Sequence, residues 1–296
     1  MMKEDFNLGE VITAMATPFD KNFNIDFKKV ELLSQHLENN CSDGILVAGT
    51  SGESPTLTHD EEFDLLNCVK SSIRKNTKII MGAGSNCTKT AIESSQKAQS
   101  LGADAILSVV PYYNKPSQDG IYAHFSQIAK NIDIPIILYN IPGRTGINMS
   151  VDTVSKLAYD FKNIKALKQS FPDMDLISEL NLKTPDDFLI YSGDDSLTLP
   201  MLSLGAYGVI SVASHIVGQQ IKTMISNFKS GNFKQALDSH LNLYPLMKNL
   251  FMAPNPIPVK QALSFMNIIE SYTRLPLTPL QDSQKDQLFS VLKNYI

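Results

Sequence analysis

The chain has 296 residues, of which 43% are apolar, and carries a formal net charge of -4 with a pI near 5.7. These values predict a water-soluble globular protein with one large domain, or one large and one small domain. Because no block of lysine and arginine stands out, nucleic acid and anionic membrane surfaces are disfavoured as partners. No apolar run reaches the length of a membrane span, and no signal core opens the sequence.

The cysteines, Cys41, Cys68 and Cys87, are odd in number and lack CxxC spacing. A set of this kind argues against a disulfide framework. We therefore expect reduced thiols and a cytoplasmic location.

Short apolar runs and amphipathic stretches alternate along most of the chain. The apolar runs predict strands over residues 11–17, 44–49, 78–84, 104–110, 135–140, 164–169, 188–193 and 208–213. The stretches between them predict helices, among them 26–40, 59–76, 89–102 and 122–132. Strands that alternate with helices form βαβ units and a parallel sheet. Eight such units match a (β/α)8 TIM barrel, which typically has about 250 residues.

An open, doubly wound sheet is the alternative fold. Such a sheet usually carries a GxGxxG turn after its first strand, where it binds a nucleotide. Here the first strand leads into residues 16–22, ATPFDKN, which contain no glycine, and residues 82–86, GAGSN, lack the third glycine. The barrel is therefore favoured.

The alternation of strands and helices stops after Ser230. Helical patterns follow over residues 232–252, 260–271 and 283–296. The proline-rich segment 253–259, APNPIPV, is expected to join two of these helices, because proline disrupts a helix interior. The sequence thus predicts a catalytic barrel over residues 1–230 and a small C-terminal α-helical domain over residues 231–296.

Active sites of such barrels lie at the carboxyl ends of the strands. Polar residues follow four of the expected strands, in the segments 49–54 (GTSGES), 111–114 (PYYN), 139–146 (YNIPGRTG) and 192–195 (SGDD). The sixth expected strand ends near Lys168. These places hold the candidate catalytic and binding residues.

Strand alternation sorts the lysines of the sixth strand. It places Ile164, Ala166 and Lys168 on one face, and Lys165 and Leu167 on the other. If Leu167 packs against the outer helices, Lys168 points into the mouth of the barrel. Lys165 then lies toward the solvated, amino-terminal end of the strand, as does Lys162 before it.

A lysine in the mouth of the barrel suggests Schiff-base chemistry. Only the neutral amine attacks a ketone, and an ordinary lysine pKa near 10.4 leaves about one amine in a thousand neutral near pH 7.4. Burial lowers that pKa, so a buried Lys168 is suited to the reaction. The alternative is a lysine that reaches water or pairs with Asp194 or Asp195. The two aspartates are themselves more typical of a helix N-cap than of a cation site.

Schiff-base chemistry also needs a proton relay and an anchor for a carboxylate. Tyr139 is expected to face inward, one strand away from Lys168, and Tyr113 and Thr50 would extend a chain of hydroxyl groups. Arg144 would bind a carboxylate in a bidentate fork. Each tyrosine taken alone is more typical of a core position. Their joint occurrence at strand ends favours a catalytic site.

A metal-dependent aldolase fits the sequence less well. Its metal would need clustered histidines, whereas the histidines are scattered at positions 36, 59, 124, 215 and 240. No GxSxG motif indicates a serine nucleophile. We therefore expect neither a metal nor another cofactor.

Several segments together resemble one family. They are GTSGESPTL (49–57), PYYNKPSQDG (111–120), LYNIPGRTG (138–146), ALKQS (166–170), SGDD (192–195), GVISV (208–212) and NPIPVKQAL (255–263). In the same order over almost the whole chain, they resemble the dihydrodipicolinate synthase/N-acetylneuraminate lyase family. The resemblance implies a homodimeric or homotetrameric class I aldolase-type lyase without a cofactor, in which pyruvate condenses with a lysine and the enamine adds to an aldehyde.

The resemblance also implies roles for single residues. Lys168 would form the Schiff base, and Tyr139, Thr50 and Tyr113 would relay protons, with Tyr113 reaching into the neighbouring subunit's site. Backbone amides of Thr50 and Ser51 would hold the carboxylate of pyruvate. The remaining pocket residues would act through their main chain, and these are Gly193 and Ile210.

The second substrate separates the branches of this family. Arg144 in YNIPGRTG is typical of the dihydrodipicolinate synthase branch, where the arginine binds the carboxylate of L-aspartate β-semialdehyde in lysine and diaminopimelate biosynthesis. Tyr113 favours the same branch. Ser51, however, replaces the usual second threonine, and Gln169 follows the lysine as in neuraminate lyases. N-acetylneuraminate lyase, a 2-keto-3-deoxy sugar acid aldolase, and a barrel that binds without catalysis therefore remain as alternatives.

Some members of the synthase branch are inhibited by lysine at a dimer interface. Glu62 stands where lysine-sensitive members often have histidine, and Thr90 where they have a glutamate. We therefore expect a vestigial lysine site, with weak or no inhibition. The residues that match parts of that site are Ser54, His59, Asn86 and Tyr112.

Overall fold

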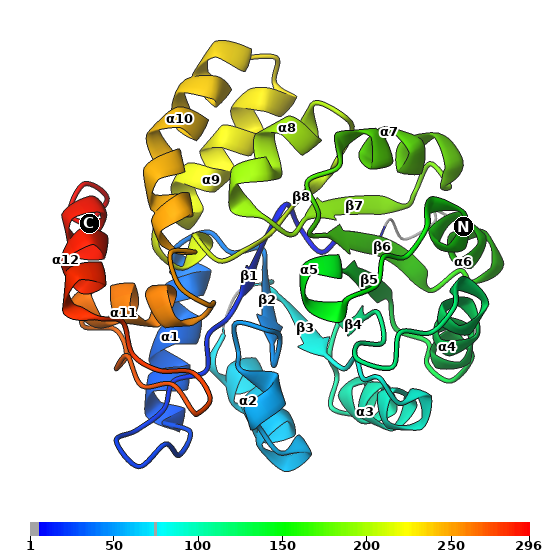
Figure 1. Cartoon of the computed structure of the whole chain (residues 1–296), viewed down its shortest axis with the longest axis horizontal. Coiled ribbons are helices and arrows are strands. Elements are labelled where there is room, and N and C mark those ends of the chain that lie inside the picture. Colours follow the sequence, from blue (N-terminus) through cyan, green and yellow to red (C-terminus); the bar gives the residue numbers. More distant parts are fainter. Residues whose placement is uncertain (1–5, 74–75) are drawn as a thin grey trace.

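Eight parallel strands close into a barrel in the computed structural model of the chain, which describes residues 6–73 and 76–296 (Figure 1). The strands follow one another around the barrel in sequence order, and the last pairs with the first. Their bounds are Val11–Ala14 (β1), Gly44–Val47 (β2), Lys78–Gly82 (β3), Ala105–Val109 (β4), Ile136–Asn140 (β5), Ile164–Gln169 (β6), Leu189–Ser192 (β7) and Gly208–Ser211 (β8). The predicted barrel is confirmed, although most strands are shorter than the apolar runs.

Helices surround the strands (Figure 1). Their bounds are Phe27–Asn39 (α1), His59–Ser72 (α2), Thr88–Ser100 (α3), Gln118–Lys130 (α4), Pro142–Thr145 (α5), Val151–Asp160 (α6), Met174–Lys183 (α7), Thr198–Leu202 (α8) and Ser214–Lys229 (α9), with short 3-10 helices at Ser54–Thr56 (η1) and Asp195–Leu197 (η2). The expected helix over 59–76 ends at Ser72, and its positions 74–75 lie outside the described residues. Helix α4 begins at Gln118 instead of residue 122, because the Ser117 hydroxyl accepts a hydrogen bond from the Gly120 amide and caps the helix.

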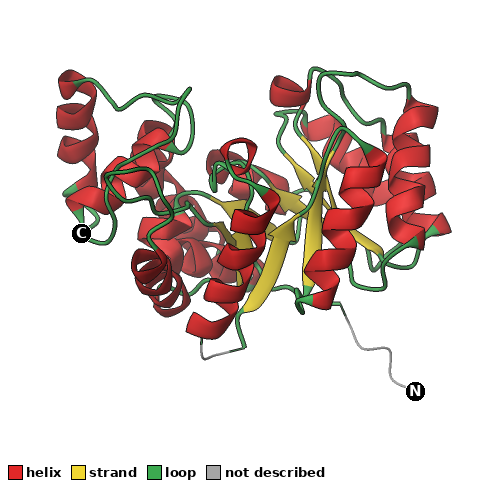
Figure 2. Ribbon diagram, turned by 90° about the horizontal axis from the view of Figure 1, so that it is seen from below, coloured by secondary structure: helices red, strands yellow, loops and turns green. Residues whose placement is uncertain are grey.

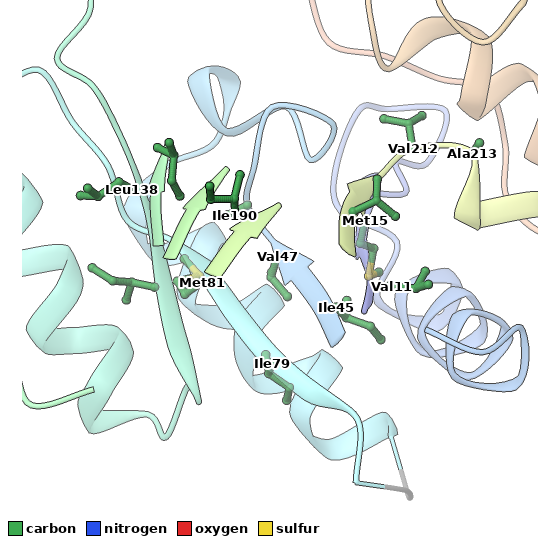
Figure 3. Close-up of a cluster of buried hydrophobic side chains, with 14 of the residues drawn as sticks. Val11, Met15, Ile45, Val47, Ile79, Met81, Leu138, Ile190, Val212 and Ala213 are labelled. Carbon is green, nitrogen blue, oxygen red and sulfur yellow. The ribbon is translucent and has the colours of Figure 1, made fainter. Parts of the chain in front are cut away.

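The hydrophobic core has two layers, one on each face of the barrel wall. Side chains such as Ile12, Ile80 and Tyr139 fill the interior of the barrel. The opposite face of the strands packs against the helices, through residues that include Val11, Ile45, Val47, Ile79, Met81, Leu138 and Ile190 (Figure 3). This alternation is the reason that the strands read as continuous apolar runs, since both of their faces are buried.

Strand β6 contains an irregularity that corrects one sequence-based expectation. Ile136 pairs with Ile164, but the next residue of β5, Ile137, pairs with Ala166, so β6 carries an extra residue at Lys165. Ile164 therefore packs in the outer layer, and not on the inward face that was expected. Ala166 faces the interior, as expected.

The final helices lie to one side of the barrel (Figures 1 and 2). They are Phe233–Asn249 (α10), Ile257–Phe265 (α11) and Asp282–Leu292 (α12), and α10 packs along α9. The expectation that residues 253–259 all lie between helices is wrong, because α11 begins at Ile257. Pro258 fits in its first turn, where a missing N–H costs no hydrogen bond. The division into residues 1–230 and 231–296 stays a prediction.

No helix within residues 6–73 and 76–296 combines the length and the apolar character that crossing a membrane requires.

His215 links the segments that follow the first and the last strand of the barrel. Its Nε2 accepts a hydrogen bond of 3.1 Å from the Ala16 amide, which follows β1, and its Nδ1 lies 2.8 Å from the Val212 carbonyl, which follows β8. A ring that accepts through one nitrogen and donates through the other is neutral. Burial lowers the pKa of this fully buried imidazole to about 4.

We predict that His215→Gln flattens the acid dependence of folding stability. The unfolded chain takes up a proton near the ordinary histidine pKa of about 6.5, whereas folded His215 takes it up near pH 4. The stability from this site is therefore complete above pH 6.5 and is lost as the pH falls toward 4. Between pH 6.5 and pH 4, the free energy of unfolding of the wild type should fall by up to about 3 kcal/mol more than that of the variant. Urea unfolding at a series of pH values checks this, and parallel stability curves would contradict it.

Candidate active site

A cavity of about 520 Å³ opens at the carboxyl ends of the strands. Its walls include Thr50 after β2, Tyr139 on β5 and Arg144 in α5. Asn255, which precedes α11, also contributes to the wall. The structure thus brings three residues predicted from the sequence to one cavity, at the end of the barrel where such sites form.

Lys168 points into the barrel beside Tyr139. The two residues are register partners on neighbouring strands, and both side chains are buried. The Lys168 Nζ lies 4.5 Å from the centre of the Tyr139 ring. An aromatic face at this distance attracts an ammonium group. Unlike a carboxylate, however, it carries no net negative charge that would pair with the amine. The amine therefore lies over the Tyr139 ring and, within the described residues, forms no ion pair with a carboxylate.

Asp194 and Asp195 do not form an ion pair with Lys168. Asp194 caps η2, where its side chain accepts a hydrogen bond of 2.9 Å from the Ser196 amide. Asp195 is buried and accepts hydrogen bonds from the Ser211 hydroxyl and from the amides of Val212 and Ala213. Burial raises the pKa of Asp195, while these donors oppose that rise. The expectation of an N-cap is confirmed for Asp194, and Asp195 instead fastens the turn after β8.

Gly193 leaves room for the lysine at the end of β7. A Cβ at this position would lie 1.8 Å from Ser170 Oγ and 3.0 Å from Lys168 Cε. The Ser170 hydroxyl is buried beside it and has no hydrogen-bond partner among the described residues. Any side chain at position 193 would therefore press on the lysine. Ile210, the other residue expected to line the pocket through its main chain, lies inside the barrel on β8.

The loop over residues 49–54 leaves two of its backbone donors unused within the described chain. The amides of Gly52 and Ser54 donate to the Gly49 carbonyl, and the Glu53 amide donates to the Thr50 carbonyl. Within the described residues, the amides of Thr50 and Ser51 donate to no protein acceptor. Two adjacent free N–H groups at the mouth of a barrel can bind a carboxylate.

Tyr113 lies outside the cavity of its own chain. Its side chain is 89% exposed, and its backbone has a φ of 71°, a left-handed conformation that is uncommon for a tyrosine. The neighbouring Tyr112, by contrast, lines the cavity. A single chain therefore does not bring Tyr113 to Lys168.

The residues that match a lysine site are partly assembled around the same cavity. Ser54, His59 and Tyr112 line it, whereas the Asn86 carbonyl accepts a hydrogen bond from the Asn114 side chain. The His59 Nδ1 lies 3.0 Å from Glu62 Oε2. Burial raises the pKa of Glu62, although His59 opposes that rise.

Gln169 occupies the outer face of β6, away from the cavity. The Asn140 amide donates a hydrogen bond of 3.0 Å to its Oε1, and the Asn140 Oδ1 accepts one from the Met149 amide. Gln169 is 1% exposed. This glutamine therefore supports the loop that contains Arg144 but does not touch the space above Lys168.

Sequence reasoning missed the residues that hold the loop 49–54. The side-chain amide of Asn255 donates a hydrogen bond of 2.9 Å to Ser51 Oγ, and Lys260 forms an ion pair of 2.8 Å with Glu53. Both residues lie in the segment NPIPVKQAL, which contributed to the family resemblance but had been given no role in the site. A single charged residue in a mostly apolar helix, IPVKQALSF, was the available signal.

Comparison with known proteins places the chain in a family. The profile of the Dihydrodipicolinate synthetase family matches residues 7–295. The chain is 51% identical over 287 residues to the 4-hydroxy-tetrahydrodipicolinate synthase of Prochlorococcus marinus (strain MIT 9515), a match that covers 97% of this chain and 95% of the relative. It is 45% identical over 286 residues to the synthase of Bacillus subtilis (strain 168), covering 97% and 99% of the two chains.

A solved structure agrees with these matches. The crystal structure of the dihydrodipicolinate synthase from Cyanidioschyzon merolae with lysine bound has a TM-score of 0.95 to this chain at 48% identity, and the match covers 97% of each chain. The chain belongs to the dihydrodipicolinate synthetase family. The predicted family, TIM-barrel fold and Schiff-base-forming lyase activity of a 4-hydroxy-tetrahydrodipicolinate synthase are confirmed.

We predict that Gly193→Ala lowers activity at least about tenfold, because the added methyl group displaces Lys168 Cε and Ser170 Oγ. Gly143→Ala is the matched control, since a Cβ at that position meets no atom within 4 Å beyond its chain neighbours and its own helix backbone. The double variant Gly193→Ala/Ser170→Gly should recover part of the loss by removing one of the two contacts. Steady-state assays of the synthase reaction measure the effect, and equal activity of both alanine variants would contradict it.

Proposed function

We propose that this enzyme condenses pyruvate, held as a Schiff base on Lys168, with L-aspartate β-semialdehyde. The observation that carries the proposal is the buried Lys168 amine, 4.5 Å from the Tyr139 ring at the mouth of the barrel. A buried amine near a tyrosine side chain combines the two groups that carbinolamine formation and dehydration require, a nucleophile and a proton donor.

The proposed reaction begins with attack of the neutral Lys168 amine on the pyruvate ketone. Loss of water gives the Schiff base, and removal of a proton from the methyl group gives an enamine. The enamine carbon then attacks the aldehyde carbon of the second substrate, which forms the new carbon–carbon bond and leaves an iminium on Lys168. Attack of the second substrate's own amino group on the iminium carbon closes the ring and releases the lysine. Tyr139, Thr50 and Tyr113 carry the protons that these steps release and consume.

The free amides of Thr50 and Ser51 bind the carboxylate of pyruvate in this proposal. This role is supported by the hydrogen bonding of the loop, because both N–H groups lack a protein acceptor in the described chain. The main chain at Gly193 and Ile210 completes the pocket around the substrate. The serine at position 51 retains the amide, so this departure from the family pattern leaves the carboxylate site intact.

Arg144 selects the second substrate. It lies in the short helix α5 at the edge of the cavity, where its guanidinium is exposed and can form two parallel hydrogen bonds to a carboxylate. A substrate that ends in a carboxylate is thereby favoured over one that presents only hydroxyl groups. Gln169 does not oppose this assignment, since it faces away from the cavity.

The active form is a homodimer or a homotetramer in the cytoplasm. An exposed tyrosine with a left-handed backbone, Tyr113, is suited to insertion into a neighbouring subunit. The unpaired cysteines Cys41, Cys68 and Cys87 are consistent with a reducing compartment.

A vestigial lysine site accompanies the active site. Ser54, His59 and Tyr112 line the cavity, but the neighbouring Glu62 is already engaged by His59. Asn86, the fourth matching residue, contributes its carbonyl to the Tyr112 loop by way of Asn114. Inhibition by lysine is therefore proposed to be weak or absent.

Borohydride trapping separates the two steps of the proposed reaction. Reduction in the presence of pyruvate should leave an adduct on Lys168 of the wild type and of Arg144→Ala, and none on Lys168→Ala. Arg144→Ala should form that adduct but lose at least about a hundredfold in kcat/KM with the semialdehyde. Peptide mass analysis locates the adduct. A wild-type enzyme without an adduct on Lys168 would disprove the mechanism.

Mixing two inactive variants tests whether Tyr113 acts across an interface. In a hybrid of Lys168→Ala and Tyr113→Phe subunits, the site with an intact Lys168 receives an intact Tyr113 from its neighbour. Random mixing in equal amounts should therefore restore about a quarter of wild-type activity. If Tyr113 serves its own chain, both sites of every hybrid stay defective and activity does not return.

A further inference from the structure

A second buried lysine, Lys260, lies behind the active-site loop. Its Nζ is 2.8 Å from Glu53 Oε1, and the two side chains are 0% and 1% exposed. Glu53 is the fifth residue of the GTSGES loop, whereas Lys260 belongs to α11. Burying two charges carries a large desolvation cost, so an apolar pair of the same size would often serve stability equally well. The pair therefore requires an explanation other than stability.

Glu53 is held by both of its carboxylate oxygens. Oε1 accepts from Lys260, and Oε2 accepts a hydrogen bond of 2.9 Å from the Arg274 amide. Its backbone has a φ of 57°, a left-handed conformation that is unfavourable for a residue with a side chain. The C-terminal segment thus holds the loop in a turn that its own backbone preference disfavours.

Lys260 keeps its charge in the folded protein near neutral pH. Burial lowers the pKa of Lys260 to about 8, while the adjacent Glu53 carboxylate raises it. The amine also lies 4.2 Å from the centre of the Phe19 ring, on which the Arg274 guanidinium stacks at 4.5 Å. Near neutral pH, Lys260 is therefore a charged anchor and not a nucleophile.

Two further contacts anchor the same loop. The Thr17 hydroxyl donates a hydrogen bond of 2.7 Å to the Gly52 carbonyl, and the side-chain amide of Asn255 donates one of 2.9 Å to Ser51 Oγ. Consecutive residues 51, 52 and 53 are thus each bound from outside the loop. The amides that remain without a protein acceptor in the described chain, those of Thr50 and Ser51, are in the part of the turn that these contacts orient.

We propose that Lys260 and Glu53 are positioning residues for carboxylate recognition, which fix the turn so that the amides of Thr50 and Ser51 point at the carboxylate of pyruvate. This inference rests on the proposed function of the site. Because the anchors act on the carboxylate-binding turn and not on Arg144, the affinity for pyruvate depends on them and the affinity for the second substrate does not.

The test compares Lys260→Met with a matched control, Lys222→Met, which breaks a partly buried ion pair with Asp43 near the amino end of β2. Lys260→Met should raise KM for pyruvate about tenfold, with kcat at saturating pyruvate and KM for the semialdehyde within about twofold of wild type. The pyruvate concentration that gives half-maximal borohydride adduct on Lys168 should rise by the same factor. Lys222→Met should leave all these values unchanged.

Thr17→Val provides a second variant, because it removes the hydrogen bond to the Gly52 carbonyl but keeps the side-chain shape. It should raise KM for pyruvate about threefold and spare the other constants. An unchanged pyruvate KM in a folded Lys260→Met, or in Thr17→Val if Lys260→Met does not fold, overturns the inference. So does an equal rise in both KM values, which would indicate a general structural defect. Absence of the adduct in the wild type would instead overturn the proposed function itself.

Discussion

The irregular pairing between β5 and β6 determines what Lys168 faces. Each residue of a strand points to the opposite side from its neighbour, so a shift of one position turns every side chain over. Without the extra residue at Lys165, the register that starts at Ile136 and Ile164 would place Lys168 opposite Asn140, on the outer wall. With it, Lys168 is opposite Tyr139 and inside the barrel. The proposed pairing of Lys168 with Tyr139 depends on this bulge.

Much of the fold could be predicted from the sequence, because a barrel strand with both faces buried must be a continuous apolar run, and these runs alternate with amphipathic helices. The inward position of Lys168 was also predictable, since Leu167 beside it is apolar and packs against helices. The outward position of Ile164 was not. A bulge leaves no mark in the pattern when the residues around it, like Ile164 and Ala166, suit either layer.

The anchors of the active-site loop were beyond prediction for another reason. Glu53 and Lys260 are 207 positions apart, and periodicity within a segment carries no information about which distant segment it will meet. Ser51 and Asn255 show the same limit. The start of α11 at Ile257 was missed because proline disrupts helix interiors but is accepted in a first turn, and the sequence does not show where that turn begins.

The two buried lysines illustrate how surroundings assign different tasks to one side chain. Lys260 has a carboxylate within 2.8 Å, which keeps it charged and makes it a fixed structural cation. Lys168 has the ring of Tyr139 beside it and, within the described residues, no ion pair with a carboxylate. An amine becomes a nucleophile only when its proton can leave. Across the described chain, the protein therefore buries one lysine on β6 without a carboxylate partner and a second lysine, on α11, that is paired with a carboxylate.

The loop over residues 49–54 is held by residues that come much later in the sequence and are therefore synthesised after it. Its partners Asn255, Lys260 and Arg274 emerge from the ribosome more than 200 residues after it. The last strand ends at Ser211, so a growing chain possesses every strand of the barrel while this loop still lacks its C-terminal contacts. Residues 255–274 therefore supply the C-terminal contacts of this loop after every strand of the barrel has been synthesised.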